Sequence, residues 1–253
     1  MFNSQGNEPI RVVPLRPPAG LIGAAAPAAA PAQLTYRNGP LLANVEVFTI
    51  FWGTAWQQPD QSGLVDQLNG FFDYILSSPL IDQLSEYSVT GYQIGYGSHS
   101  GTLNVDSPDL QGTVDDTDIQ NMLQQQISNG TVPQPDANTL YFIFLPTGVT
   151  VTQGGSASCQ QFCGYHDDIS GNVFYAVMPF PDCSGCTGAM SNFNSLTVTV
   201  SHELCEAITD PVPGEGWYDD NNGEIGDICA WNTKTVGQYT VQQEWSNNAN
   251  ACV

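Results

Sequence analysis

The residues whose types and spacing could carry out chemistry are concentrated in residues 201–206, which read Ser-His-Glu-Leu-Cys-Glu. His202 is followed directly by Glu203, and Glu206 lies four positions after His202. On a helix, positions four apart share one face, so His202 and Glu206 could bind one metal ion while Glu203 acts as general base. The pattern resembles the HExxH helix of zinc proteases with a carboxylate in place of the second histidine. The alternative is an ordinary amphipathic helix with a polar solvent face.

A second acidic segment, Gly-Glu-Ile-Gly-Asp-Ile-Cys at residues 223–229, supplies Glu224 and Asp227. In thermolysin-like sites a third carboxylate ligand follows the helix pair at about this distance. We therefore expect Glu224 or Asp227 to complete a Zn²⁺ site. Because one imidazole with two carboxylates is a harder ligand set, Ca²⁺ or Mn²⁺ could take its place or bind in addition. The intervening residues 217–223 could themselves bind Ca²⁺ or form a plain Asn/Asp/Gly turn.

Two further residues are candidates for stabilising a developing oxyanion, namely Tyr218 in the acidic turn and His166 after Cys163-Gly-Tyr. For His166 the alternative is a structural histidine packed by nearby disulfides. Paired carboxylates with Trp52, Trp56 and Trp217 exposed beside them would instead favour a carbohydrate-binding or carbohydrate-cleaving role.

The charge of the chain is strongly one-sided. Its 253 residues include 25 acidic and 4 basic ones, a formal net charge of −21. This charge repels phosphate backbones and anionic membranes, so we expect no nucleic-acid partner. Bound cations, high salt or an acidic environment would offset the self-repulsion. No apolar stretch is long enough to cross a bilayer, so we expect no membrane insertion.

The seven cysteines predict covalent cross-links. Cys159, Cys163, Cys183 and Cys186 form a CxxxC and a CxxC pair, which fits either disulfides or a zinc knuckle, and the composition favours disulfides. Cys229 and Cys252 are candidates for a third bridge. Cys205 is left over, as a buried small apolar group or, alternatively, a soft metal ligand. Together these features favour an extracellular, secreted protein, although the chain carries no clear signal peptide.

The order of elements predicts an α/β fold with a mixed, partly parallel twisted sheet and flanking helices. This order is compatible with a zincin core of the metzincin-like type. Residues 1–36 are rich in Pro and Ala and are expected to form a flexible tail, and residues 43–253 a single α/β domain that carries the metal site. Strands are expected at residues 45–52, 90–96, 140–145, 172–178 and 239–245, and helices at 63–77, 116–128 and 196–209.

Taken together, several segments resemble the EXORDIUM-like, phosphate-induced family, as a bacterial-type relative. They are Cys159-x-x-x-Cys-Gly-Tyr-His166, Phe174-Tyr-Ala-Val, Cys183-x-x-Cys186, His202-Glu-Leu-x-Glu-Ala and Glu224-Ile-Gly-Asp-x-Cys229. The resemblance covers roughly residues 43–253 and implies secretion, disulfides and a cell-wall-like setting. It implies no established reaction. The chain departs from the family at Cys205, where a small residue such as alanine is expected, and in its Pro/Ala-rich tail.

These observations lead to two hypotheses about function. The first is a secreted metal-dependent hydrolase, a zinc metallopeptidase acting on a peptide or a cell-wall polymer. Glu203 would be its base, and His202, Glu206 and either Glu224 or Asp227 its metal ligands. The second is a non-catalytic extracellular or cell-wall binding protein, in which the same residues hold a structural zinc or calcium ion. The sequence specifies no oligomeric state.

Overall fold

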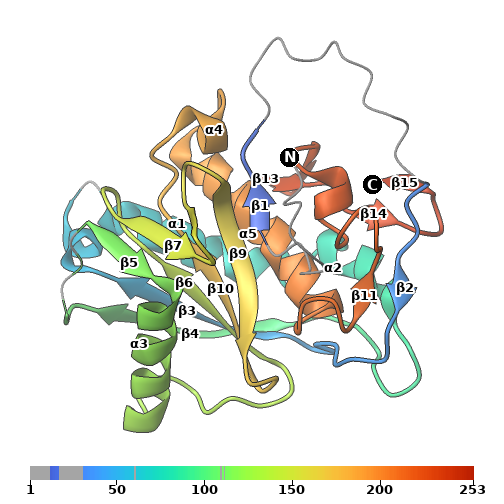
Figure 1. Ribbon diagram of the computed structural model, residues 1–253, viewed down its shortest axis with the longest axis horizontal. Helices are drawn as coiled ribbons and strands as arrows, with labels where there is room; N and C mark the ends of the chain where they lie inside the picture. The colour runs from blue at the N-terminus through green and yellow to red at the C-terminus, as the bar shows by residue number, and fades with distance from the viewer. Residues whose placement is uncertain (1–11, 17–30, 60, 109, 111) are drawn as a thin grey trace.

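The structure is a computed structural model that describes residues 12–16, 31–59, 61–108, 110 and 112–253. Its centre is a six-stranded sheet in the order β1-β9-β10-β6-β3-β4 (Figure 1). The strands of this sheet are β1 (Val12–Pro14), β3 (Glu46–Trp52), β4 (Ser98–Val105), β6 (Thr139–Phe144), β9 (Phe162–Ile169) and β10 (Val173–Met178).

Parallel and antiparallel pairing are combined in this sheet. The pairs β10–β6, β6–β3 and β3–β4 are parallel, whereas β9 is antiparallel to β10. The short strand β1 pairs antiparallel with β9 on its outer side. The prediction of a mixed, partly parallel sheet with flanking helices is therefore confirmed.

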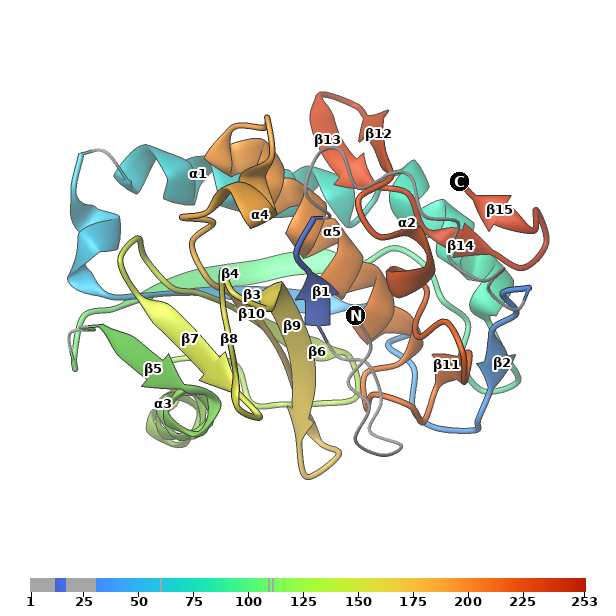
Figure 2. The same ribbon diagram turned by 45° about the horizontal axis from the view of Figure 1, so that its top comes forward.

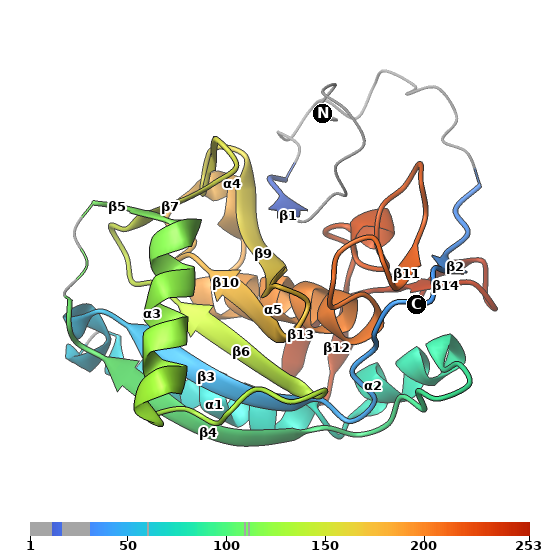
Figure 3. The same ribbon diagram turned by 60° about the horizontal axis from the view of Figure 1, so that its bottom comes forward.

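Helices cover both faces of the sheet (Figure 3). Helices α1 (Ser62–Ile75), α2 (Pro79–Leu84) and α5 (Asn192–Thr209) pack on one face, against apolar side chains of β3, β6 and β10. Helix α3 (Asp116–Asn129) and strands β5 (Thr113–Asp115) and β7 (Thr150–Gln153) pack on the other. Because β3 and β6 are buried on both faces, they are nearly uniformly apolar.

Local sequence explains where helices α3 and α5 begin and where α5 ends. Asp115 caps α3 in a capping box with Asp118, and Ser191 caps α5 by accepting the Asn194 N–H. Helix α5 ends at Thr209, next to Asp210 and the helix-breaking Pro211.

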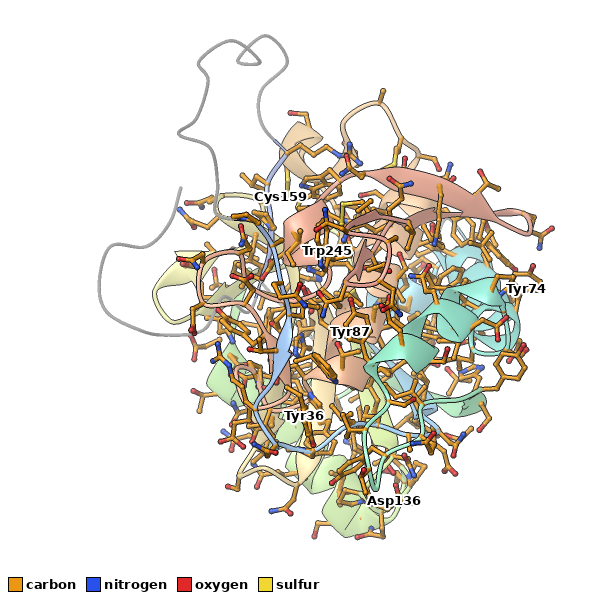
Figure 4. The ribbon with its side chains drawn as sticks, turned by 90° about the vertical axis from the view of Figure 1, so that its right-hand side faces the viewer. Tyr36, Tyr74, Tyr87, Asp136, Cys159 and Trp245 are labelled. Carbon is orange, nitrogen blue, oxygen red and sulfur yellow. A yellow bond between two sulfur atoms is a disulfide. The ribbon has the colours of Figure 1, made fainter. Side chains whose placement is uncertain are left out.

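The C-terminal third adds three short pairs of strands, one of which includes β2 (Thr35–Tyr36) from the N-terminal region, and β13 (Tyr239–Gln242) of another pair packs on α5. They are β11 (Trp217–Tyr218) with β2, β12 (Thr233–Val236) with β13, and β14 (Trp245–Ser246) with β15 (Ala251–Cys252). The remaining elements are β8 (Ser156–Ala157), α4 (Ser184–Thr187) and the 3-10 helices η1 (Thr54–Gln57), η2 (Ser85–Tyr87) and η3 (Asp227–Cys229). Tyr87 lies on this side of the molecule between Tyr36 and Trp245 (Figure 4), and its hydroxyl donates to the Trp245 carbonyl.

Several predicted boundaries differ from the structure. Residues 90 and 91 form a turn closed by an isolated bridge between Val89 and Tyr92, and residues 93–97 form no regular element. The edge strand instead is the polar, alternating β4. Strand β9 was not predicted, because its Gly-Tyr-His-Asp-Asp stretch is not uniformly apolar. Of the expected strand at residues 239–245, residues 239–242 form β13 of a separate hairpin and Trp245 begins β14, both outside the main sheet.

The segment expected to be a flexible tail is partly built into the fold. Within residues 1–36, β1 pairs with β9 and β2 pairs with β11. Residues 1–11 and 17–30 lie outside the described residues. None of the described helices is long and apolar enough to cross a bilayer.

Candidate metal centre

The motif helix α5 lies in the interior, so its His-Glu-x-x-Glu face is not a solvent face. Every residue from Ser195 to Thr209 is buried, and His202, Glu203 and Glu206 are each 0% exposed. The helix packs between the sheet and β13. The interpretation of the motif as the polar surface of an amphipathic helix is therefore wrong.

The turn that carries Glu224 and Asp227 lies against His202 and Glu206 of α5. His202 Nε2 lies 2.9 Å from Glu206 Oε1, and the same oxygen accepts the Asp227 N–H at 3.1 Å. Gly226 makes this approach possible, because a Cβ atom there would lie 2.8 Å from His202 Nδ1 and 2.9 Å from Glu206 Oε1. The carboxylate of Asp227 also accepts the Glu224 N–H.

Strand β9 brings His166 into the same cluster. His166 Nδ1 lies 2.9 Å from Glu203 Oε2 and 3.6 Å from Glu206 Oε2. Its Nε2 lies 3.2 Å from the Asp210 carbonyl oxygen and 3.5 Å from Glu224 Oε1. His166 therefore contacts the motif helix itself, and the packing of this histidine is by acids rather than by disulfides.

Two groups of metal-ligand types overlap here. In each group the potential ligand atoms all lie within 4.8 Å of one another. One group is His202, Glu206 and Asp227, and the other is His166, Glu203 and Glu206. Glu206 belongs to both groups, so it would be a ligand of the ion in either case.

Unpartnered buried atoms support the fit of a cation to this cluster. Among the described residues, His202 Nε2, Glu203 Oε1, Glu206 Oε2 and both Glu224 carboxylate oxygens have no aligned hydrogen-bond partner. Leaving such an atom buried and unsatisfied costs about 1–3 kcal/mol, and more for a charged group. Coordination of one ion would satisfy several of them together.

The hydrogen-bond partners of the two imidazoles determine which ring nitrogen of each could bind a metal ion. His166 Nε2 faces a backbone carbonyl, which leaves Nδ1 directed at Glu203 and Glu206, as in metal-bound histidines whose second nitrogen donates to a carbonyl. His202 Nδ1 faces Gln242 Nε2 at 2.8 Å. Since that amide also donates to the Gly226 carbonyl, coordination through His202 Nε2 requires the amide of Gln242 to turn over.

Buried acids outnumber buried bases in the cluster, which favours the binding of a cation. Five acids are 0% exposed around two histidines: Glu203, Glu206, Asp210, Glu224 and Glu244. Burial raises the pKa of Glu203, raises that of Glu224 well above its ordinary value, and raises that of Asp210 to about 6. Burial lowers the pKa of His166, but its hydrogen bond to Glu203 and the negative charges around it outweigh this and raise it to about 9. A divalent cation would stabilise the ionised acids.

Two residues that support this cluster, Asp210 and Gln242, and one buried acid beside it, Glu244, were not predicted from the sequence. Asp210 accepts the backbone N–H groups of residues 214–216 and so fixes the loop after α5. Gln242 orients His202 from β13. Glu244 is buried near His202, and burial raises its pKa well above its ordinary value. Only the Asp-Pro that ends the motif helix could have marked Asp210; Gln242 and Glu244 carry no local signal.

Tyr218 is placed by β2. It pairs with Thr35, and the Arg37 guanidinium carbon lies 4.4 Å from the centre of its ring. In the adjoining turn, the Asp219 carboxylate accepts the N–H groups of Gln33, Asn221 and Asn222. The bonds from Asn221 and Asn222 are those of an Asx turn, so the turn interpretation of residues 217–223 is favoured over a calcium loop.

The cysteines pair as disulfides. The bridges are Cys159–Cys183, Cys163–Cys186 and the predicted Cys229–Cys252. A zinc knuckle is excluded because its thiolates would be those of bridged cysteines. Cys205 is free and fully buried in the apolar core, as expected of a small apolar group. Trp52 and Trp56 are each 2% exposed, so the expectation that they form an exposed carbohydrate-binding surface is wrong.

Comparison with known proteins adds no relative from which a function could be transferred. No protein-family model matches the chain, and no curated protein matches it. What the protein does must therefore be inferred from its own residues and contacts.

Proposed function

We propose that the protein is a metal-dependent hydrolase of the zincin-like kind that acts on peptides. The observation that supports this is the convergence of a motif helix, strand β9 and a downstream acidic turn on Glu206. His202 and Asp227 contact Glu206 Oε1, whereas His166, which also contacts Glu203, lies 3.6 Å from Glu206 Oε2. The arrangement of a helix under a mixed sheet with an antiparallel strand beside it is also that expected of a zincin core.

The residues have distinct roles in this proposal. His202, Glu206 and Asp227, with Glu224 beside them, would hold the ion, and a bound Zn²⁺ would supply a Lewis acid and a more acidic water. Glu203 is the base: Oε2 is held by His166, while Oε1 has no hydrogen-bond partner among the described residues and can take a proton. His166 orients Glu203 and balances its charge. Tyr218 pairs with Thr35 of β2, and we assign it no catalytic role.

The alternative ligand group changes the role of one residue. If the ion were held by His166, Glu203 and Glu206, then Glu203 would be a ligand and His202 would donate Nε2–H to Glu206. Metal content separates these assignments. His202→Gln and His166→Gln would be compared by metal analysis after dialysis, and the variant that falls below stoichiometric metal identifies the histidine that binds.

A second candidate function is a structural ion in a non-catalytic extracellular protein. The specific observation in its favour is the burial of the cluster, because His166 is 1% exposed and Glu203, Glu206 and Glu224 are 0% exposed. A catalytic ion needs an open position that substrate can reach, whereas a structural ion has a closed shell.

The three disulfides favour an oxidising setting outside the cytosol for either function. Secretion to a cell-wall-like environment, as implied by the EXORDIUM-like resemblance, is part of the same proposal. The formal net charge of −21 agrees with peptide or polysaccharide partners rather than nucleic acids.

The test combines metal analysis with hydrolysis of a peptide library. Wild type, Glu203→Gln and Glu244→Gln would be loaded with Zn²⁺, Mn²⁺ or Ca²⁺ and assayed from pH 4 to pH 8. We expect Glu203→Gln to keep the metal and lose hydrolysis, and Glu244→Gln, an equally buried control, to keep both. Stoichiometric metal with no hydrolysis by wild type at any pH would reject the hydrolase and favour the structural ion.

A further inference from the structure

The feature that carries a further inference is the N-terminal strand β1. It lies beside β9 and over α5 in two views (Figures 1 and 2), although 147 residues separate the two strands in the sequence. Without β1, the N–H and C=O groups along one side of β9 would be an open sheet edge. Exposed edges of this kind bind extended peptides as an added strand.

The edge of β9 and the loops next to it hold residues 12–16, Val-Val-Pro-Leu-Arg, largely by main-chain bonds. Val12 pairs with Tyr165 and Val13 with Gly164. At the other end, the Arg16 N–H donates to the Gly185 carbonyl at 2.8 Å, and Trp231 Nε1 donates to the Pro14 carbonyl at 2.9 Å. Main-chain bonds of this type accept a peptide of any sequence, so the side chains must provide selectivity.

Side-chain subsites alternate along the same segment. Val13 is 0% exposed and packs against Cys163 and Cys186, which are disulfide-bonded to each other. Pro14 between the subsites is exposed. Leu15 covers Gly185, where an added Cβ would lie 3.2 Å from its Cδ2 atom. The groove therefore selects an aliphatic side chain followed two residues later by a second one.

A third subsite recognises positive charge. The Arg16 guanidinium lies 4.1 Å from the centre of the Trp231 ring, and its Nε donates to the Cys186 carbonyl at 3.4 Å. Trp231 has a φ of 68°, a rare backbone conformation for a bulky residue. Held strain of this kind clusters at ligand-binding positions. The net charge of −21 would further favour a basic peptide.

We infer that the edge of β9 is the peptide-binding groove of this protein and that residues 12–16 occupy it as a covalently attached pseudo-ligand. The partner it fits is an extended peptide with the pattern aliphatic-x-aliphatic-Arg. Calling this peptide a substrate rests on the proposed function. In the same register, a peptide extended one residue beyond the Val12 position would lie opposite His166, next to Glu203.

The experiment uses the full chain with a recognition sequence for a site-specific protease inserted between Ala24 and Ala25. After folding, the chain is cut, and a fluorescent peptide of residues 10–18 is added to cut and uncut protein. Tethering gives the attached segment an effective concentration of about 1 mM, so at about 10 μM peptide the uncut protein should bind about 100-fold less. Anisotropy measures binding in the presence and absence of chelator.

Matched peptides test the register of the groove. A Val13→Glu peptide places a charge in the buried subsite and should bind at least about 100-fold more weakly. A Pro14→Glu peptide, with the same charge one residue away at an exposed position, should bind within about threefold of the parent. An Arg16→Gln peptide should lose about fivefold.

Several results would overturn the inference. One is equal binding of the Val13→Glu and Pro14→Glu peptides. Another is a cut protein whose fragment does not exchange with excess peptide in a day, or that unfolds by circular dichroism when the fragment leaves, since β1 would then be a structural strand. Binding without hydrolysis would leave the groove in place and reject only the hydrolase.

Discussion

Replacing Glu206 by Gln is the most direct perturbation of the proposed centre, because this carboxylate belongs to both groups of potential ligands. The change preserves shape and removes the charge and one ligand oxygen. A cation that binds the folded state only, at 100 times its dissociation constant, stabilises the fold by about 2.7 kcal/mol. For a chain of this size each kcal/mol raises the melting temperature by about 2–4 °C, so wild type should gain about 5–11 °C.

Binding of the ion to the unfolded chain should detract little from this gain. The unfolded chain keeps its disulfides, which leaves Cys205 as the free thiol among the described residues, and has three histidines in all. The assay is differential scanning calorimetry of chelator-treated protein, with and without Zn²⁺ or Mn²⁺. The dissociation constant needed to set the concentration comes from titration calorimetry on wild type.

Glu244→Gln is the matched control, because Glu244 is also 0% exposed with both oxygens unpartnered among the described residues, yet belongs to neither ligand group. We expect Glu206→Gln to lose the metal-dependent gain and Glu244→Gln to keep it. A Glu206→Gln protein that gains as many degrees as wild type would refute a centre built on this residue.

Three further predictions concern the closing turn, the buried acids and the C-terminal bridge. Gly226→Ala should weaken metal binding at least about tenfold by titration calorimetry, because its Cβ would meet His202 and Glu206, whereas Gly63→Ala meets nothing within 4 Å and should leave affinity unchanged. Metal-free protein should become more stable on acidification from pH 7 to pH 5, because the folded state then holds protons on Asp210, Glu203 and Glu224 that the unfolded state largely lacks. Asp210, with its pKa raised from 3.8 to about 6, contributes about 1.3 kcal/mol over this interval. A melting temperature that falls over that interval in chelator would contradict the predicted proton uptake. Removing the Cys229–Cys252 bridge, with a sequence separation of 23, should lower the free energy of unfolding in urea by about 3 kcal/mol. Cys205→Ala leaves all bridges intact and should lower it by about 1 kcal/mol. Equal losses of unfolding free energy would contradict a stabilising role of the bridge.

Sequence patterns alone determined the elements whose burial is uniform or whose ends are capped. The apolar runs at β3, β6 and β10 predicted buried strands, and the Asp-rich start of α3 predicted its cap. The spacing of His202 and Glu206 likewise predicted that they share a helix face. Local periodicity and capping act over a few residues, so they can be read without the fold.

Only the tertiary structure decided what surrounds that helix face. His166 reaches Glu203 because β9 pairs antiparallel with β10, and β9 has no local signal as a strand. Gln242 and Glu244 come from the C-terminal hairpin region, and β1 comes from a segment that composition marks as a tail. Long-range pairing of strands brings these residues to α5. Local side-chain type and spacing do not reveal which strands pair, because the pairing joins segments far apart in the sequence.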